Sequence, residues 1–212
     1  MFGGLYEHVL DIIFPESTRA KRVRSDQEPL PLSPHLRSIR GRSVTILSPY
    51  ADKRIEEAIC SVKFERSRVA ALRLAALLDD YLTEHVAEKQ LFGGTPIHIV
   101  PVPLGRRREL SRGENQVVLT LRESRFVQDG TLALLECLTR TRETVPQTTL
   151  AREARFENIR GAFAVRPNCL KKLRGAHVLL IDDVTTTGAT LSEAATNLEQ
   201  AGAKVECLAL AG

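Results

Sequence analysis

Val178-Leu-Leu-Ile-Asp-Asp-Val-Thr-Thr-Thr-Gly-Ala-Thr190 is the stretch of this 212-residue chain that decides its fold. The apolar run from Val178 to Ile181 predicts a buried strand, and two acids, Asp182 and Asp183, follow it directly. After the loop, apolar residues recur at helical spacing, which predicts a helix. A buried strand, a polar loop and a helix in succession are typical of an open α/β sheet. Such sheets bind ligands at the carboxyl ends of their strands.

The loop after the two acids carries the groups that a sugar phosphate needs. Threonines supply hydroxyl donors, and Gly188 lets the backbone approach a ligand or take a positive φ angle. The free N–H groups of the following helix favour a phosphate, and adjacent carboxylates could hold the vicinal hydroxyls of a ribose. A purely structural crossover would explain the apolar positions but not the acids and hydroxyls. The predicted sugar-phosphate site comprises Asp182, Asp183, Thr185, Thr186, Thr187, Gly188, Ala189 and Thr190.

The composition describes a chain that can bury one core and has a mild basic excess. Of its residues 43% are hydrophobic, and 30 basic against 26 acidic residues give a net charge of +4. This charge fits phosphorylated ligands or nucleic acid and distinguishes neither. The four cysteines are scattered without a Cys-x-x-Cys pair, so no zinc site is expected; they are Cys60, Cys137, Cys169 and Cys207.

The first residues do not have the pattern of a targeting or membrane segment. Glu7, His8 and Asp11 interrupt the apolar run of residues 1–14, and no basic region precedes it. An amphipathic helix over 3–14 is predicted instead. The other apolar segments are too short or too charged to span a bilayer. We therefore expect a cytoplasmic protein without a membrane partner.

Strand and helix patterns alternate along most of the chain. Strands are predicted over 44–47, 97–102, 131–138, 162–165, 178–181 and 205–210, and helices over 52–62, 66–86, 114–126 and from 191 onward, with a helical turn at 151–156. Residues 15–42 are rich in Pro, Ser and Arg and predict a linker or loosely ordered arm. The expected architecture is an α/β fold with a parallel sheet over 44–212 and a small helical and arm region over 1–43.

Several blocks resemble known proteins, in a consistent order. The stretch 178–190 resembles the signature by which type I phosphoribosyltransferases bind 5-phosphoribosyl-1-pyrophosphate (PRPP). Tyr50 with Val62-Lys63-Phe64, then Val100-Pro-Val-Pro-Leu104 with Arg112-Gly-Glu-Asn-Gln116, resemble segments of the ComF family, the competence-associated branch of these enzymes. The segment Gln147 to Phe163 resembles that family's central signature. Together the blocks imply a type I phosphoribosyltransferase fold from about residue 48 onward.

Two features depart from the family pattern. Many members carry an amino-terminal zinc finger just after a Phe-Pro or Leu-Pro pair, but here Phe14-Pro15 is followed directly by Glu16-Ser17-Thr18-Arg19, without cysteines. Glu114 stands where the family usually has Phe. The resemblance therefore implies a member without the zinc finger, in which any contacts made by the finger are in doubt.

The resemblance implies a reaction in which pyrophosphate is displaced from C1 of PRPP. Thr185 to Thr190 would hold the 5′-phosphate, and Asp182 and Asp183 the ribose. Mg²⁺ would arrive with the substrate's phosphates, with Asp182 and Asp183 as candidate ligands. No residue stands out as a catalytic general base. Thr186 occupies the place where purine-salvage relatives have an acid, which argues against a 6-oxopurine acceptor.

Basic residues are candidates for the pyrophosphate side of the site. Arg106, Arg107 and Arg108 follow Pro103, at the expected end of a parallel strand, and bidentate arginine geometry suits pyrophosphate. A solvated basic turn is the alternative. Lys63 is an isolated lysine in an apolar segment and could either contact a phosphate or extend its ammonium to solvent from a helix end.

The resemblance also implies a lid that closes over PRPP, formed by residues 147–163. The polar residues expected on its ligand side are Gln147, Arg152, Arg155, Asn158 and Arg160. The alternative is a surface helix that only caps the fold.

Three functions compete on this reading. The first is a Mg²⁺-dependent phosphoribosyltransferase with an unknown acceptor. The second, implied by the family's association with natural transformation, is a non-catalytic protein that binds single-stranded DNA or a helicase partner. Basic residues at 19–24 and Arg37, Arg40 and Arg42 would serve that function, although the arm lacks aromatic residues for base stacking. The third is a PRPP-sensing regulator. Because homodimers are common among relatives, the resemblance also implies a homodimer as one candidate assembly.

Overall fold

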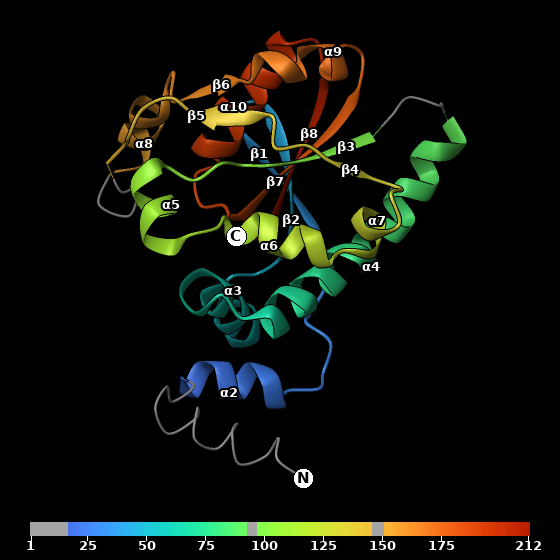
Figure 1. Cartoon of the computed structure of the whole chain (residues 1–212), viewed down its shortest axis with the longest axis vertical. Coiled ribbons are helices and arrows are strands. Elements are labelled where there is room, and N and C mark those ends of the chain that lie inside the picture. Colours follow the sequence, from blue (N-terminus) through green and yellow to red (C-terminus); the bar gives the residue numbers. More distant parts are fainter. Residues whose placement is uncertain (1–16, 93–96, 146–150) are drawn as a thin grey trace.

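The central sheet has six strands in the order β1-β2-β8-β7-β3-β4 (Figure 1). The computed structural model describes residues 17–92, 97–145 and 151–212, without the side chains of 86–92, 108, 112, 152 and 153. The strands are β1 (His35–Ile39), β2 (Arg42–Ser48), β3 (Ile97–Pro101), β4 (Ala133–Leu134), β7 (His177–Val184) and β8 (Lys204–Ala211). β1 is antiparallel to β2, and every other neighbouring pair in this sheet is parallel. The predicted α/β fold with a mostly parallel sheet is confirmed.

Helices cover both faces of the sheet, with a separate hydrophobic core under each layer. Helices α3 (Lys53–Glu65), α4 (Arg68–Phe92) and α6 (Gln116–Glu123) pack on one face, and α10 (Ala189–Gln200) packs on the other (Figure 1). β7 contributes to both cores because successive side chains of a strand point to opposite faces. Leu179 and Ile181 face α3, α4 and α6, whereas Val178 and Leu180 face α10.

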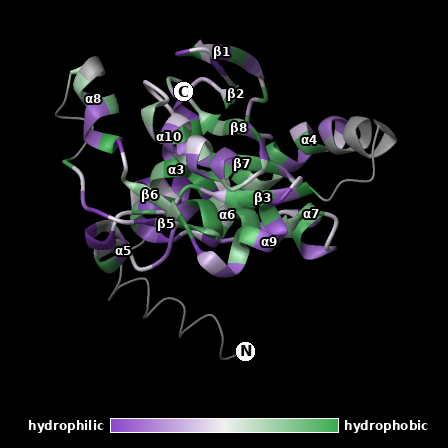
Figure 2. Cartoon of the chain, turned by 90° about the horizontal axis from the view of Figure 1, so that it is seen from above, coloured by the Kyte–Doolittle hydropathy of each residue, from purple (hydrophilic) through white to green (hydrophobic). Residues whose placement is uncertain are grey.

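Burial on both faces explains why the signature strand is an uninterrupted apolar run rather than an alternating one. The four residues from Val178 to Ile181 are at most 2% exposed. Full burial of each such side chain contributes roughly 1.5–3 kcal/mol. Figure 2 shows the hydrophobic residues concentrated in the central strands, β7 and β3 among them. The strand thereby holds the polar residues after it in a fixed position.

Local capping sets the ends of the helices that surround the site. The Asp52 side chain accepts hydrogen bonds from the first amides of α3, and Asn115 accepts one from the Val117 amide at the start of α6. The turn between β1 and β2 has positive φ angles at Arg40 and Gly41, the geometry of a tight two-residue hairpin. This hairpin forms the edge of the sheet beside α10.

The predicted linker over 15–42 is wrong for the part that the structure describes. Helix α2 (Thr18–Ser25) packs against α3 and α4, and β1 joins the sheet. The guanidinium of Arg73 in α4 binds the Val23 carbonyl, the Asp26 carboxylate and the Glu28 carbonyl at 2.6–3.0 Å. Long-range pairing and arginine contacts of this kind leave no local pattern in a Pro- and Arg-rich sequence. The predicted helix over 3–14 lies outside the described residues.

Three other predicted elements also differ. The predicted helix over 114–126 is interrupted at Ser124, which separates α6 from α7 (Arg125–Gln128), because the buried Asp79 carboxylate binds the Ser124 hydroxyl and the Arg125 amide. The predicted strand over 131–138 is reduced to β4, and β5 (Leu138–Arg140) instead pairs antiparallel with β6 (Phe163–Val165) in a second sheet. The arginines after Pro103 form a helix, α5 (Arg106–Arg112), rather than a loop.

The remaining short elements lie between the two strands of the second sheet or connect that sheet to β7. They are α8 (Arg152–Ile159), the 3₁₀ turn η2 (Pro167–Cys169) and α9 (Leu170–Leu173). Among the described helices, none combines the length and the apolar character needed to cross a membrane.

Candidate functional site

The loop of residues 185–188 leaves the sheet at the carboxyl end of β7. Its start is held by the Thr185 amide, which donates to the Ala211 carbonyl at the end of β8 over 2.8 Å. Its end is Gly188, which has a φ of 71° and precedes the first turn of α10. We call this segment the phosphate loop. The predicted residues Asp182 to Thr190 therefore lie together at the carboxyl end of β7, a central strand of the sheet.

The two acids before the loop have different partners, although their side chains lie close enough to interact. Asp183 lies two residues after Ile181 in β7 and therefore points to the same face of the sheet, toward α3 and α6. Asp182 lies two residues after Leu180, whose side chain faces α10. The Asp183 carboxylate is 8% exposed and accepts hydrogen bonds from Lys63 Nζ at 2.7 Å and Gln116 Nε2 at 2.8 Å. The Asp182 carboxylate accepts a hydrogen bond from the Asp183 amide at 3.0 Å.

Burial acts differently on the two carboxylates. It raises the pKa of Asp182 to about 8, and the neighbouring negative charge of Asp183 adds to the rise. Burial works on Asp183 in the same sense, but the Lys63 ammonium and the hydrogen bonds from Lys63 and Gln116 hold its pKa below the ordinary value of 3.8. Asp183 is thus the ionised member of the pair.

Two arginines from distant parts of the chain reach the phosphate loop. Arg37 Nη1 in β1 donates to the Thr186 carbonyl at 3.3 Å, and Arg155 Nη1 in α8 donates to the Thr186 hydroxyl at 3.0 Å. These residues and Thr187 line a cavity of about 350 Å³. The buried Thr187 hydroxyl has no hydrogen-bond partner among the described residues. A cationic pocket with an unsatisfied hydroxyl at the start of a helix suits an anion.

The residues predicted for the pyrophosphate side are separated in the structure. Arg106 lines a second cavity of about 290 Å³ at the carboxyl end of β3, together with Arg140 and Arg166. The Arg107 amide donates to the Glu143 carboxylate at 3.0 Å, while the side chain of Arg108 lies outside the described part. Lys63 neither extends to solvent nor joins these arginines, because it is engaged by Asp183.

Only part of the predicted lid faces the phosphate loop. Arg155 contacts Thr186, and α8 is further held by Arg40, whose guanidinium lies 3.8 Å from the centre of the Phe156 ring. Asn158 instead forms two hydrogen bonds with the backbone of Val145. Arg160 pairs with Glu157 in solvent. Gln147 lies outside the described residues, as does the side chain of Arg152.

Two residues that the sequence does not single out belong to this site. Gln116 belongs to one of the blocks that resemble the family, which assigns it no role; its signal is that it is a buried polar residue within the apolar face of α6. From the sequence, Arg37 belongs to the predicted basic arm over residues 15–42. Only the pairing of β1 with β2 places it over the phosphate loop, 149 residues away in the chain.

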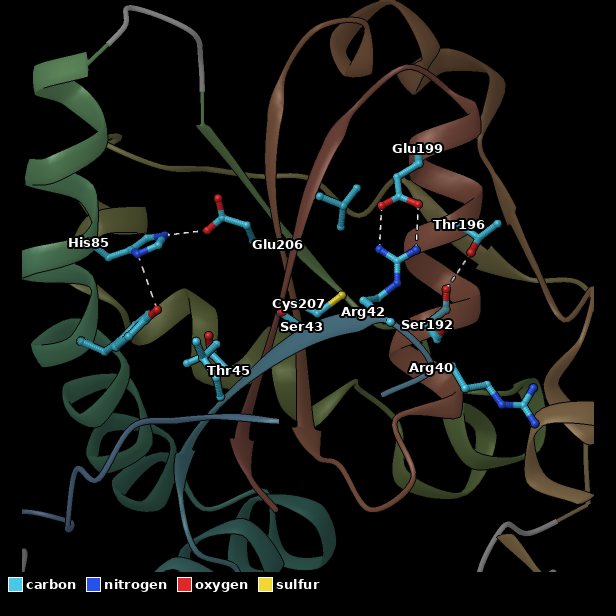
Figure 3. A pocket seen from close by; sticks show the side chains of 14 residues that line it. Arg40, Arg42, Ser43, Thr45, His85, Ser192, Thr196, Glu199, Glu206 and Cys207 are labelled. Carbon is cyan, nitrogen blue, oxygen red and sulfur yellow. Dashed lines mark hydrogen bonds and ion pairs between the residues drawn. The ribbon is translucent and has the colours of Figure 1, made fainter. Parts of the chain in front are cut away.

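A larger cavity, about 810 Å³, lies at the opposite end of the strands (Figure 3). It is lined near the amino ends of β2 and β8 by the Arg42–Glu199 ion pair and by His85, whose Nε2 lies 2.9 Å from the Glu206 carboxylate. Their charges largely compensate one another. This cavity therefore lacks the excess positive charge that distinguishes the pocket at the phosphate loop.

The described residues do not form a metal site of protein ligands alone. They contain no group of three or more His, Cys, Asp or Glu residues placed to hold an ion. Asp183 is already compensated by Lys63, which leaves Asp182 as the carboxylate of the pair without a cationic partner. This arrangement fits a Mg²⁺ ion that is bound mainly by a ligand's phosphate oxygens and by water.

Comparison with known proteins finds a matching domain and two groups of similar sequences. Residues 135–212 match the phosphoribosyl transferase domain. The chain is 36% identical over 155 residues to DNA utilization protein YhgH of Escherichia coli (strain K12), an alignment that covers 71% of this chain and 64% of that protein. Competence protein F of Haemophilus influenzae is 34% identical over 143 residues, covering 66% of this chain and 59% of that protein.

The chain thus matches less than two thirds of the length of these relatives. A solved structure of glutamine PRPP amidotransferase from Bacillus subtilis, complexed with ADP and GMP, aligns with 56% of this chain and 23% of that one, at 16% identity and a TM-score of 0.35. From the domain match and the similarity to competence and DNA utilization proteins, the chain belongs to the ComF family of phosphoribosyltransferase-like proteins.

Proposed function

We propose that this protein binds PRPP and transfers its phosphoribosyl group to an acceptor, with release of pyrophosphate. The observation that carries the proposal is the cationic pocket at the phosphate loop. It combines Arg37 and Arg155 with the unsatisfied hydroxyl of Thr187 at the start of α10. A phosphate monoester supplies the acceptor oxygens that all three groups require.

The rest of PRPP would extend from this pocket toward the acids. With the 5′-phosphate in the phosphate loop, the ribose lies beside Asp182, and the pyrophosphate points toward β3, where Arg106 lines the second cavity. The bond from C1 to the pyrophosphate oxygen breaks, and the acceptor forms the new bond to C1. Mg²⁺ bound by the phosphates would neutralise charge on the leaving pyrophosphate, with Asp182 as the protein ligand in reach.

The protein's own residues supply positioning rather than proton transfer in this scheme. Arg155 would fix the phosphate and, with α8, shield the reacting centre from water. No described side chain at the loop is placed as a general base for the acceptor, so we expect an acceptor that is already nucleophilic. The acceptor itself stays undefined.

The test is a titration of PRPP into the purified protein with and without Mg²⁺. We expect saturable binding that Mg²⁺ strengthens and that disappears in the Asp182→Ala/Asp183→Ala double variant. Arg155→Gln should weaken binding by about tenfold, because a charge-assisted hydrogen bond to the phosphate is lost. Arg174→Gln is the matched control, since Arg174 is exposed near the amino end of β7. Equal effects of the two arginine variants would argue against the pocket.

A competing function follows from the relatives, which are named for competence and DNA utilization. In this alternative the protein binds single-stranded DNA or a helicase partner in the cytoplasm and does not turn over PRPP. The basic residues of the segment 15–42 give little support to this DNA-binding alternative, because Arg22 pairs with Glu57 and Arg42 pairs with Glu199.

Pyrophosphate release in the presence of candidate acceptors separates the proposals. PRPP binding without release, across nucleobase, amine and carboxylate acceptors, would favour a PRPP-sensing regulator. Salt-dependent binding of single-stranded DNA, together with no detectable binding of PRPP, would favour the DNA-binding function.

A further inference from the structure

Lys63 and Gln116 converge on one oxygen of Asp183. Lys63 Nζ lies 2.7 Å and Gln116 Nε2 lies 2.8 Å from Asp183 Oδ2, while Oδ1 accepts the Val184 amide at 2.6 Å. Both carboxylate oxygens are therefore engaged by donors from the protein. We call Lys63, Gln116 and Asp183 the buried clamp.

All three members of the clamp are shielded from solvent. Asp183 and Gln116 are 8% and 6% exposed, and the Lys63 side chain is 17% exposed. An ion pair removed from water in this way is broken only at a large cost, because each charge left alone remains buried. Asp183 is thus committed to α3 and α6, which pack on the face of the sheet away from α10.

Asp182 has the opposite environment. Its position in β7 pairs with Ala209, which belongs to the core under α10, and no described basic side chain forms an ion pair with it. For a ribose whose 5′-phosphate occupies the phosphate loop, Asp182 is therefore the acid that no described ammonium or guanidinium already engages. Equal participation of both acids would require Asp183 to leave the clamp.

We infer that the two acids have different tasks: Lys63 and Gln116 fix Asp183 as a positioning residue, and Asp182 is the carboxylate that contacts the sugar. This inference rests on the proposed binding of PRPP. It replaces a pyrophosphate contact of Lys63 with a contact inside the protein. The Lys63 ammonium supplies at Asp183 the positive charge that an ion would otherwise have to supply.

The test measures thermal unfolding and PRPP titration, the latter with Mg²⁺ present, on one set of full-length variants. The set contains Lys63→Met, Asp183→Asn, the double variant Lys63→Met/Asp183→Asn, and Asp182→Asn. Lys53→Met is the matched control: Lys53 lies on the same helix, but its side chain is 72% exposed and pairs with Glu56 at the surface.

Each single clamp variant should lower the unfolding midpoint by on the order of 10 °C, because one buried charge loses its partner. The double variant should lower the midpoint by less than the sum of the two single shifts, because neither buried charge is left without its partner. Asp182→Asn should keep the midpoint within about 2 °C of the wild type, since an amide of equal size replaces a carboxyl group that has no cationic partner among the described residues. It should nevertheless weaken PRPP binding by about tenfold or more.

Two results would overturn the inference. One is strict additivity of the midpoint shifts of Lys63→Met and Asp183→Asn. The other is a Lys63→Met protein that unfolds like the Lys53→Met control and yet loses PRPP as completely as Asp182→Asn, which would make Lys63 a direct pyrophosphate ligand. If Lys63→Met does not fold, Gln116→Leu removes one of the two side-chain donors and should lower the midpoint by about half as much.

The outcome also separates this inference from the proposed function. If the wild type does not bind PRPP, the proposed function fails. The unfolding cycle on Lys63 and Asp183 still decides whether the clamp exists.

Discussion

Gly188 shows how one residue links the phosphate loop to the edge of the sheet. Its φ of 71° lies in the left-handed region, and a Cβ added there would overlap Ile39 Cδ1 in β1. Glycine is therefore required twice, by the backbone and by the neighbouring side chain. The sequence predicts the first requirement from the position of the glycine, and the second depends on the placement of β1.

Gly188→Ala should destabilise the protein by about 2–4 kcal/mol, because backbone strain and a clash with a buried isoleucine add together. Gly41→Ala is the matched control: its φ is 80°, but nothing lies within 4 Å of an added Cβ. We expect the control to lose only about 1 kcal/mol. Urea unfolding measures both values. Equal losses for the two variants would show that Ile39 does not crowd Gly188.

At the scale of elements, α10 is fastened to the sheet at both of its ends. Its start follows the phosphate loop, and near its end Glu199 accepts two hydrogen bonds from Arg42 of β2 at 2.6 and 2.8 Å (Figure 3). The Arg42 guanidinium holds the pKa of Glu199 below its ordinary value of 4.5, against the effect of burial. The pair therefore fixes the helix whose first turn forms the pocket.

This pair predicts a stability difference that depends on pH. Because the pKa of Glu199 is lowered in the folded state, its contribution is complete above pH 4.5 and is lost as the pH falls through the folded-state value. Glu199→Gln should therefore cost about 0.5–1 kcal/mol at pH 7, a modest value because the Glu199 side chain is 40% exposed, and progressively less as the pH falls below 4.5.

The measurement is chemical unfolding at several pH values, with Glu157→Gln as the control. Glu157 is also paired with an arginine, but its side chain is 64% exposed. A Glu199→Gln deficit that persists unchanged at pH 3 would contradict the proposed role of the ion pair.

At the scale of the whole molecule, residues 18–48 are part of the folded domain. α2 packs on α3 and α4, β1 completes the sheet edge, and Arg73 joins α4 to the turn after α2 through three acceptors. This packing brings Arg37 to the phosphate loop. The amino-terminal segment therefore contributes directly to the candidate site.

Arg73→Met should release this segment, because one buried guanidinium serves Val23, Asp26 and Glu28 together. We expect a loss of about 2–3 kcal/mol and faster tryptic cleavage within 18–28. Arg68→Met, on the same helix, is the control, since the Arg68 side chain is 77% exposed and pairs with Glu123. Unchanged cleavage in Arg73→Met would mean that packing of α2 alone holds the segment.

Local patterns in the sequence determined most elements and the identity of the candidate site. The apolar run before Asp182 predicts β7, and the hydroxyls and Gly188 predict the phosphate loop, because both depend on neighbouring residues. Only the tertiary structure decided what Lys63, Gln116 and Arg37 contact. Their partners lie 120, 67 and 149 residues away, so the order of strands and the packing of α3, α6 and β1 select them. A periodic pattern records which face of an element is buried, but not which distant side chain meets it there.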